Sequence, residues 1–143
     1  MAYELISLAD ESAYRTLYMD TYCNPISPIF TFDSIVVVFF EDKFDHAFFE
    51  SANRVEKDKS VFSQTRAERI LWIKETLEDP TADIRQGYDS KTKTYDNSRR
   101  VAIVKGDYVV IIKLTSEKRA SFITAYVADN SIQKIMLSPE WQG

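Results

Sequence analysis

The sequence predicts an α+β domain, in which N-terminal helices pack on one face of a C-terminal antiparallel sheet of about four strands. Apolar residues recur at helical spacing in the first half of the chain, and strand-like runs follow one another in the second half. Short turn sequences separate those runs. Helices first and strands afterwards is the order typical of an α+β fold.

The first half of the chain predicts two helices around a buried strand. Residues 8–22 place large apolar side chains on one side of a helix. The run at residues 34–40 is apolar throughout and rich in Val, which indicates a buried strand. Asp42 or Asp45 then provides an N-cap for a helix that we expect to reach about Val55.

A third helix is expected over residues 63–78. Ser63 is a favourable N-cap, apolar residues recur every three or four positions after it, and Pro80 follows the last of them. The helix is therefore predicted to be continuous and to pack on the sheet.

The second half predicts an antiparallel meander. Candidate strands cover residues 83–88, 99–105, 107–115 and 119–128. Lys105-Gly106-Asp107 is a tight hairpin signal, and Ser116-Glu117-Lys118 indicates a second turn.

The last strand is expected to present two different faces. Alternation puts Ile123, Ala125 and Val127 on one face, which is purely apolar and should meet the helices. The opposite face carries Phe122, Thr124 and Tyr126, and we expect it to be open.

Length and composition indicate a single domain over residues 1–143. An acidic extension occupies residues 1–30, and residues 34–141 form the main body. The net charge of −4 argues against a protein that coats nucleic acid without specificity, because such proteins are basic. The acidic excess lies in the first fifty residues, while the remainder is slightly basic, so a local basic site is compatible with it.

Cysteine and histidine usage narrows the chemistry. The chain has one Cys and one His, which excludes an internal disulfide and makes a zinc site implausible. A lone Cys suits a reducing cytosol, and neither a signal peptide nor a membrane-spanning run is evident. We therefore expect a cytoplasmic protein with no metal, no cofactor and no membrane partner.

The residues that suit chemistry are one imidazole, two hydroxyls and several guanidinium groups. His46 is the side chain best able to move a proton near pH 7. Thr124 and Tyr126 point their hydroxyls to the same face of a strand. Five arginines are candidates for holding a phosphate, and alternation alone does not choose between the last two: Arg66, Arg69, Arg85, Arg99 and Arg100. Taken singly, each of these residues also fits an ordinary solvated surface.

The order of these segments resembles the phage-associated branch of the barnase–EndoU–colicin–RelE nuclease superfamily. The resemblance rests on an apolar strand, on Asp-His-Ala-Phe-Phe around His46, on residues 62–73, and on the later Arg85-Gln-Gly-Tyr-Asp, Arg99-Arg100-Val-Ala-Ile-Val and Phe122-Ile-Thr-Ala-Tyr segments. It covers about residues 34–141. Members are typically metal-independent ribonucleases, often toxins.

The resemblance implies that His46 is a general acid or base, that an Arg or Lys binds phosphate, and that Thr124 and Tyr126 belong to the site. We assign Arg85 and Arg100 to catalysis with them, and Arg66, Arg69 and Arg99 to substrate binding. The expected reaction is attack of an RNA 2′-OH on the neighbouring phosphorus, which leaves a 2′,3′-cyclic phosphate. RNA and a cognate protein inhibitor or antitoxin are the expected partners.

Other readings of the chain remain open at this point. The first is a catalytically inactive binding module of phage or mobile-element origin that docks on a host protein. The second is an acidic mimic of nucleic acid, which a net charge of −4 supports only weakly. The third is a phosphodiesterase or transferase that acts on a nucleotide.

Overall fold

A computed structural model describes residues 4–25, 28–50, 61–89 and 94–128, without the side chains of His46, Glu50 and residues 85–100. The elements are α1 (Glu11–Tyr18), the π-helix η1 (Met19–Cys23), β1 (Ile29–Phe30), β2 (Val36–Val38), α2 (Lys43–Phe48), β3 (Phe49–Glu50), β4 (Val61–Phe62), α3 (Gln64–Ala67), α4 (Trp72–Glu78), β5 (Asp83–Asp89), β6 (Thr94–Lys105), β7 (Tyr108–Ser116) and β8 (Arg119–Val127). Within these ranges no helix has the length and apolar character needed to cross a bilayer.

The main sheet is curled and has the strand order β1-β2-β8-β7-β6-β5. The predicted α+β class and the antiparallel meander from β5 to β8 are confirmed. The predicted number of about four strands is wrong, because the sheet has six. The apolar run in the first half joins the edge of β8 as β2, in parallel, and β1 pairs with β2.

The two predicted hairpin turns are confirmed. Lys105 pairs with Tyr108, so Gly106 and Asp107 form a two-residue turn. Gly106 has φ +63°, a conformation that disfavours every residue with a Cβ. Ser116 pairs with Arg119, which closes the second hairpin.

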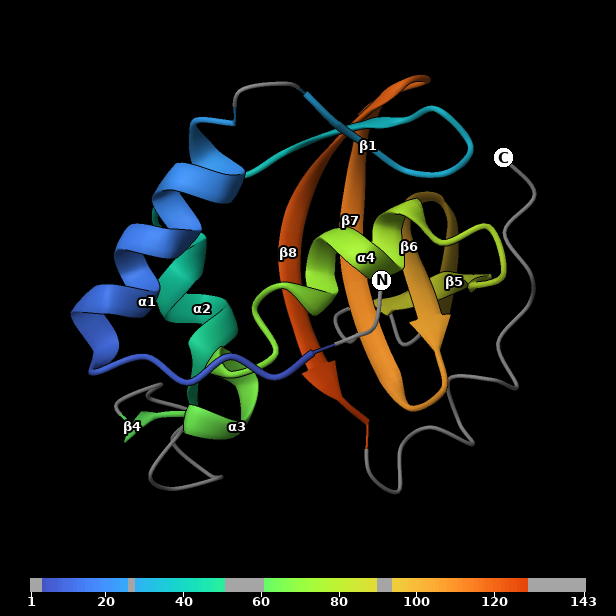
Figure 1. Cartoon of the computed structure of the whole chain (residues 1–143). Helices are drawn as coiled ribbons and strands as arrows, with labels where there is room; N and C mark the ends of the chain where they lie inside the picture. The colour runs from blue at the N-terminus through green and yellow to red at the C-terminus, as the bar shows by residue number, and fades with distance from the viewer. Residues whose placement is uncertain (1–3, 26–27, 51–60, 90–93, 129–143) are drawn as a thin grey trace.

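The helices cover one face of the sheet, and aromatic residues fill the space between them (Figure 1). Tyr18 of α1 is fully buried, and its ring contacts five others at centroid distances of 5.7 to 6.4 Å. These rings belong to Tyr22, Phe39, Phe44, Phe48 and Phe122. The Tyr18 hydroxyl donates to the Phe40 carbonyl at 2.8 Å, which satisfies its polar end. This cluster fixes α1 and α2 against β2 and β8.

A β-bulge changes the faces of β8. Ile111 lies opposite Thr124 and Ile112 lies opposite Phe122, so Ile123 is an extra residue on β8. The prediction that Phe122 lies on the open face is therefore wrong, since Phe122 is 0% exposed in the helix-facing core. Ile123 is half-buried and outside that core, again unlike the prediction.

The bulge leaves the rest of β8 on the predicted faces. Ala125 and Val127 pack toward the helices as expected. Tyr126 packs on the second face of the sheet, against a smaller cluster that includes Val104 and Val109. Thr124 shares this second face, because it has the same alternation as Tyr126.

The predicted helix over residues 63–78 is broken. Ser63 caps α3 as expected, with its Oγ accepting from the Arg66 amide at 3.2 Å. Residues 68–71 then form turns, and α4 begins at Trp72. The described contacts give a physical reason, because groups from elsewhere in the chain bind the carbonyls that a continuous helix would use.

Tyr22 contributes most to this break. Its hydroxyl donates to the Ile70 carbonyl at 2.6 Å and accepts from the Lys74 amide at 3.1 Å. These two backbone groups would bond each other in a continuous helix. The Ile6 amide similarly binds the Glu68 carbonyl at 2.9 Å.

The helix predicted to extend to about Val55 ends earlier. α2 stops at Phe48, and β3 follows directly and pairs with β4. Asp42 occupies the N-cap position but makes no side-chain capping bond. Residues 51–60 lie outside the described residues.

Candidate functional site

The predicted site residues come from six parts of the fold. His46 belongs to α2, Arg66 to α3, and Thr124 and Tyr126 to β8. Arg69 lies in the bend between α3 and α4. The backbone of Arg85 is in β5 and that of Arg99 and Arg100 is in β6, while their side chains and that of His46 lie outside the description.

Arg66 links α2, α3 and β8. Its Nη1 donates to the Ala47 carbonyl of α2 at 3.2 Å. Its Cζ lies 5.7 Å from the centroid of the Tyr126 ring, within cation–π range. Ala47 follows His46 directly, so the α2 backbone beside His46, the Arg66 guanidinium and the Tyr126 ring are neighbours.

Local structure explains why Arg66 points this way. The Ser63 cap starts α3, and the Ser63 amide donates to the Phe48 carbonyl at 2.8 Å. This bond ties the start of α3 to the end of α2. β2 pairs with β8 only as far as Ser121, and no other strand of the described residues lies beside the later part of β8 on that side. α2 and α3 approach β8 there (Figure 1). The Arg66 side chain reaches this edge of β8 at Tyr126.

The Tyr126 hydroxyl is held in its protonated form. Burial raises its pKa above the ordinary value, and the positive charge of Arg66 offsets part of that increase. At neutral pH the group is therefore a hydrogen-bond donor rather than a phenolate.

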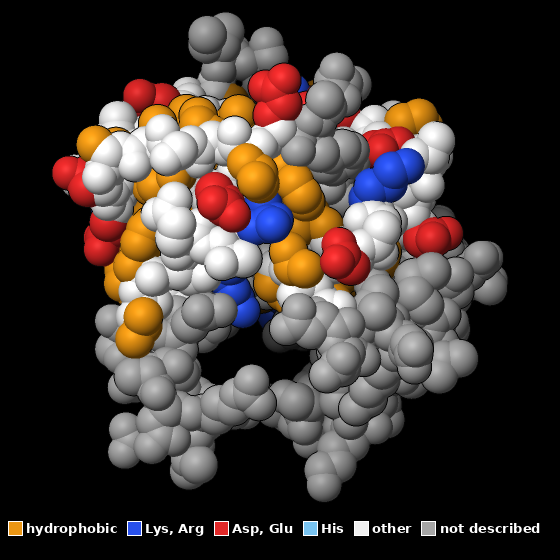
Figure 2. Space-filling model, turned by 60° about the horizontal axis from the view of Figure 1, so that its bottom comes forward, with side chains coloured by type: hydrophobic (Ala, Val, Ile, Leu, Met, Phe, Trp, Pro, Cys, Tyr) orange, Lys and Arg blue, Asp and Glu red, His pale blue; other side chains and the backbone are white. Residues whose placement is uncertain are grey.

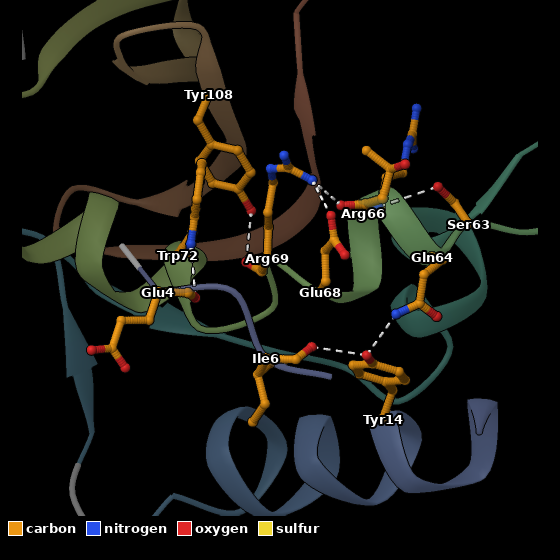
Figure 3. A network of polar contacts seen from close by, with 11 residues as sticks. Glu4, Ile6, Tyr14, Ser63, Gln64, Arg66, Glu68, Arg69, Trp72 and Tyr108 are labelled. Atoms are coloured by element: carbon orange, nitrogen blue, oxygen red, sulfur yellow. Dashed lines mark hydrogen bonds and ion pairs between the residues drawn. The ribbon is translucent and has the colours of Figure 1, made fainter. Parts of the chain in front are cut away.

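Arg69, the second arginine of the predicted phosphate clamp, makes a different set of contacts. Its Nη1 donates to the Thr65 carbonyl at 2.6 Å and to Glu68 Oε1 at 3.0 Å, and its Cζ lies 5.0 Å from the Trp72 ring (Figure 3). The Tyr108 ring meets Trp72 edge-on at 5.2 Å. These contacts orient Arg69 toward the bend between α3 and α4, so Arg66 is the better placed of the two for a ligand at Tyr126.

The register of the sheet aligns further predicted positions with the second face. Thr124 pairs with Ile111, Ile111 with Ala102, and Ala102 with Arg85. Two residues further along β7, Lys113 pairs with Ser121 of β8 on one side and with Arg100 of β6 on the other. Arg99 precedes Arg100 on β6, so alternation assigns it to the opposite face, with Val101 and Ile103.

Sequence reasoning missed Lys113. It is half-buried on the second face, in a strand that is otherwise mostly apolar. The signal was present, because Lys113 alternates with Val109 and Ile111 along β7, and that alternation assigns all three to one face.

The charge around the site is local rather than broad. On the side of the molecule shown in Figure 2, Lys and Arg side chains lie singly between acidic and hydrophobic ones. Among the described residues, no group of three or more His, Cys, Asp or Glu side chains is arranged to hold a metal ion. No protein-family model, curated protein or solved structure matches the chain.

Proposed function

We propose that this chain is a metal-independent endoribonuclease whose site lies where α2, α3 and β8 meet. The observation that carries the proposal is the position of Arg66, which contacts both the backbone beside His46 and the ring of Tyr126. A guanidinium group held between the α2 backbone next to His46 and the ring of Tyr126 suits the transition state of phosphodiester cleavage.

The proposed reaction uses the RNA's own 2′-OH as nucleophile. His46 removes the 2′-OH proton as the oxygen attacks phosphorus, and the bond to the 5′-oxygen breaks. Arg66 stabilises the charge on the non-bridging oxygens. Tyr126, which burial keeps protonated by raising its pKa, donates its proton to the leaving 5′-oxygen. Solvent then returns a proton to Tyr126 and takes from His46 the proton of the 2′-OH. The products are a 2′,3′-cyclic phosphate and a free 5′-OH.

The basic positions on the second face support binding of the RNA backbone there. Lys113 and Arg100 are directly paired across β7 and β6, and like charges at opposed positions disfavour a sheet. A bound phosphate offsets that repulsion. We therefore propose that Arg85, Arg100 and Lys113 bind the strand on either side of the cleaved bond, next to Thr124, and that Arg99, which alternation assigns to the opposite face, takes no part.

The decisive experiment is a cleavage assay with the purified chain in EDTA. RNA should be cut, and the same sequence with a 2′-deoxy sugar at the cut site should not. His46→Ala should lower the rate by roughly 10²–10⁴, the range for loss of a general acid or base. Arg66→Gln should lower it by about 10²–10³, as expected for loss of one charge-stabilising donor. Tyr126→Phe should be milder than His46→Ala, because only the hydroxyl is removed.

The control variant is Asp42→Asn. Asp42 is exposed at the start of α2 and makes no capping bond, so this variant should cleave RNA within about twofold of the parent chain. Equal cutting of RNA and the 2′-deoxy substrate would exclude 2′-OH attack. Absence of cutting by a folded protein free of any bound inhibitor would exclude the enzyme altogether.

A binding module that docks on another protein is the second candidate function. Four large hydrophobic side chains are exposed by 45 to 55% among the described residues, namely Leu5, Phe30, Phe40 and Val61. Such exposure is compatible with a protein partner, including the inhibitor or antitoxin that a toxic ribonuclease requires. Expression separates the two, because an active toxin should express poorly alone and a binding module should express well.

A further inference from the structure

A cleft lies near the opposite end of β8 from Tyr126. It has a volume of about 300 Å³ and is formed by the end of η1, by β1 and β2, and by the first residue of β8. Most of the residues that line it have apolar side chains, Pro25, Val38 and Phe39 among them, and polar atoms share its exposed surface with them. This volume is at the lower limit of small-molecule sites, so it suits a short alkyl or single-ring compound better than a nucleotide.

Among the described residues, Arg119 is the one charged side chain that lines the cleft. It is exposed, and none of the described ion pairs involves it. Its position on β8 is paired with Val36 of β2, so the guanidinium group starts from the strand next to the apolar wall. A cleft with apolar side chains on one wall and a cation at its side is complementary to an amphipathic molecule that carries one negative charge.

Cys23 completes the lining and is half-buried. Burial raises the pKa of its thiol, which keeps it neutral at pH 7 and therefore part of the apolar wall. It is also the only cysteine in the chain, so its reaction with a thiol reagent reports on this cleft alone.

We propose that this cleft binds a small amphipathic anion, with an alkyl or aryl body against Val38 and Phe39 and a single carboxylate or similar group on Arg119. The site is separate from the proposed cleavage site and does not depend on it. The ligand's charge determines its orientation, because Arg119 is the only charged group among the described residues of the lining.

The experiment measures how octanoate changes the rate at which iodoacetamide alkylates Cys23 in the full chain. Octanoate should slow the reaction saturably, and octanol, which has the same chain without the charge, should bind about tenfold more weakly. Arg119→Gln should weaken octanoate about tenfold and leave octanol unchanged. These shifts follow from losing one charge-assisted hydrogen bond.

Two further variants make the result specific. Lys118→Gln removes the neighbouring exposed cation in the β7–β8 turn, which does not line the cleft, and should change octanoate binding by less than about twofold. Val38→Trp should fill the cleft and weaken both ligands, with circular dichroism reporting whether the chain still folds. If it does not fold, the Arg119 and Lys118 variants decide the question.

Three results would overturn the proposal. They are no saturable protection of Cys23 in the parent chain, equal binding of octanol and octanoate, and equal losses in Arg119→Gln and Lys118→Gln. None of them bears on RNA cleavage, so failure here is distinguishable from failure of the proposed function.

Discussion

The hydroxyl of Tyr22 is expected to stabilise the bend between α3 and α4. Tyr22→Phe keeps the ring, which is 1% exposed, and removes only the hydroxyl. The Ile70 carbonyl and the Lys74 amide then lose their bonds of 2.6 and 3.1 Å. Each such bond contributes about 0.5–1.5 kcal/mol, and a buried group left unpaired costs about 1–3 kcal/mol.

An opposing effect reduces this loss. The Ile70 carbonyl and the Lys74 amide are four residues apart, so they can approach each other and form the bond of an ordinary α-helix. The contacts of the bend with Ile6 and Tyr108 resist that movement. We therefore expect Tyr22→Phe to lower the free energy of unfolding by about 2 kcal/mol. This value lies between two limits, one in which Ile70 and Lys74 bond to each other and one in which both groups stay unpaired.

Urea denaturation measures this difference. With a slope of about 1–3 kcal/mol per molar urea, a loss of 2 kcal/mol lowers the midpoint by roughly 1 M. Tyr126→Phe is the matched control, because no described hydrogen bond involves the Tyr126 hydroxyl, and it should change stability by less than about 0.5 kcal/mol. If both variants shifted the midpoint equally, or if Tyr22→Phe had no effect, the role of the inserted hydroxyl would be refuted.

Other perturbations test the fold independently. Burial raises the pKa of both Tyr18 and Tyr22 far above the ordinary value of 10, so these tyrosines ionise in the unfolded chain before they ionise in the folded one. The free energy of unfolding should therefore be unaffected below pH 10 and fall above it by about 1.4 kcal/mol per pH unit for each tyrosine. Urea denaturation across pH measures this, and a free energy of unfolding that stays constant from pH 9 to 11.5 would contradict it. Gly106→Ala should lower the free energy of unfolding by about 1 kcal/mol through the positive φ alone, because no atom lies within 4 Å of an added Cβ. A urea midpoint equal to that of the parent chain would show that the turn changes conformation to accept alanine. Ser63→Ala should cost about 1 kcal/mol through loss of the α3 cap, measured in the same way, with Thr65→Ala as an exposed control.

The meander from β5 to β8 was predictable because its signals are local. Gly106 lies at a turn where a positive φ is needed, and alternating residues mark the strands on either side. The Ser63 cap was predictable for the same reason, since a side chain and an amide three residues apart suffice to form it. Contacts of this kind do not depend on the rest of the fold.

Local sequence signals could not predict the parallel pairing of β2 with β8 or the bulge at Ile123. β2 is too short to carry its own alternation signal, and its partner is about eighty residues away in the sequence. A bulge shifts alternation by one residue, and the shift is concealed because Phe122 and Ile123 are both apolar. Phe122 was therefore assigned to the wrong face.

The same division applies to the candidate site. The chemical type of His46, Arg66 and Tyr126 is a property of the sequence, and it suffices to propose proton transfer and phosphate binding. The tertiary structure decides which ring each guanidinium group contacts: Arg66 lies over the ring of Tyr126, and Arg69 lies over the ring of Trp72. The bend between α3 and α4 separates the environments of these two arginines. It forms because Tyr22 and Ile6, from distant parts of the chain, bind the Ile70 and Glu68 carbonyls, which would accept backbone amides in a continuous helix.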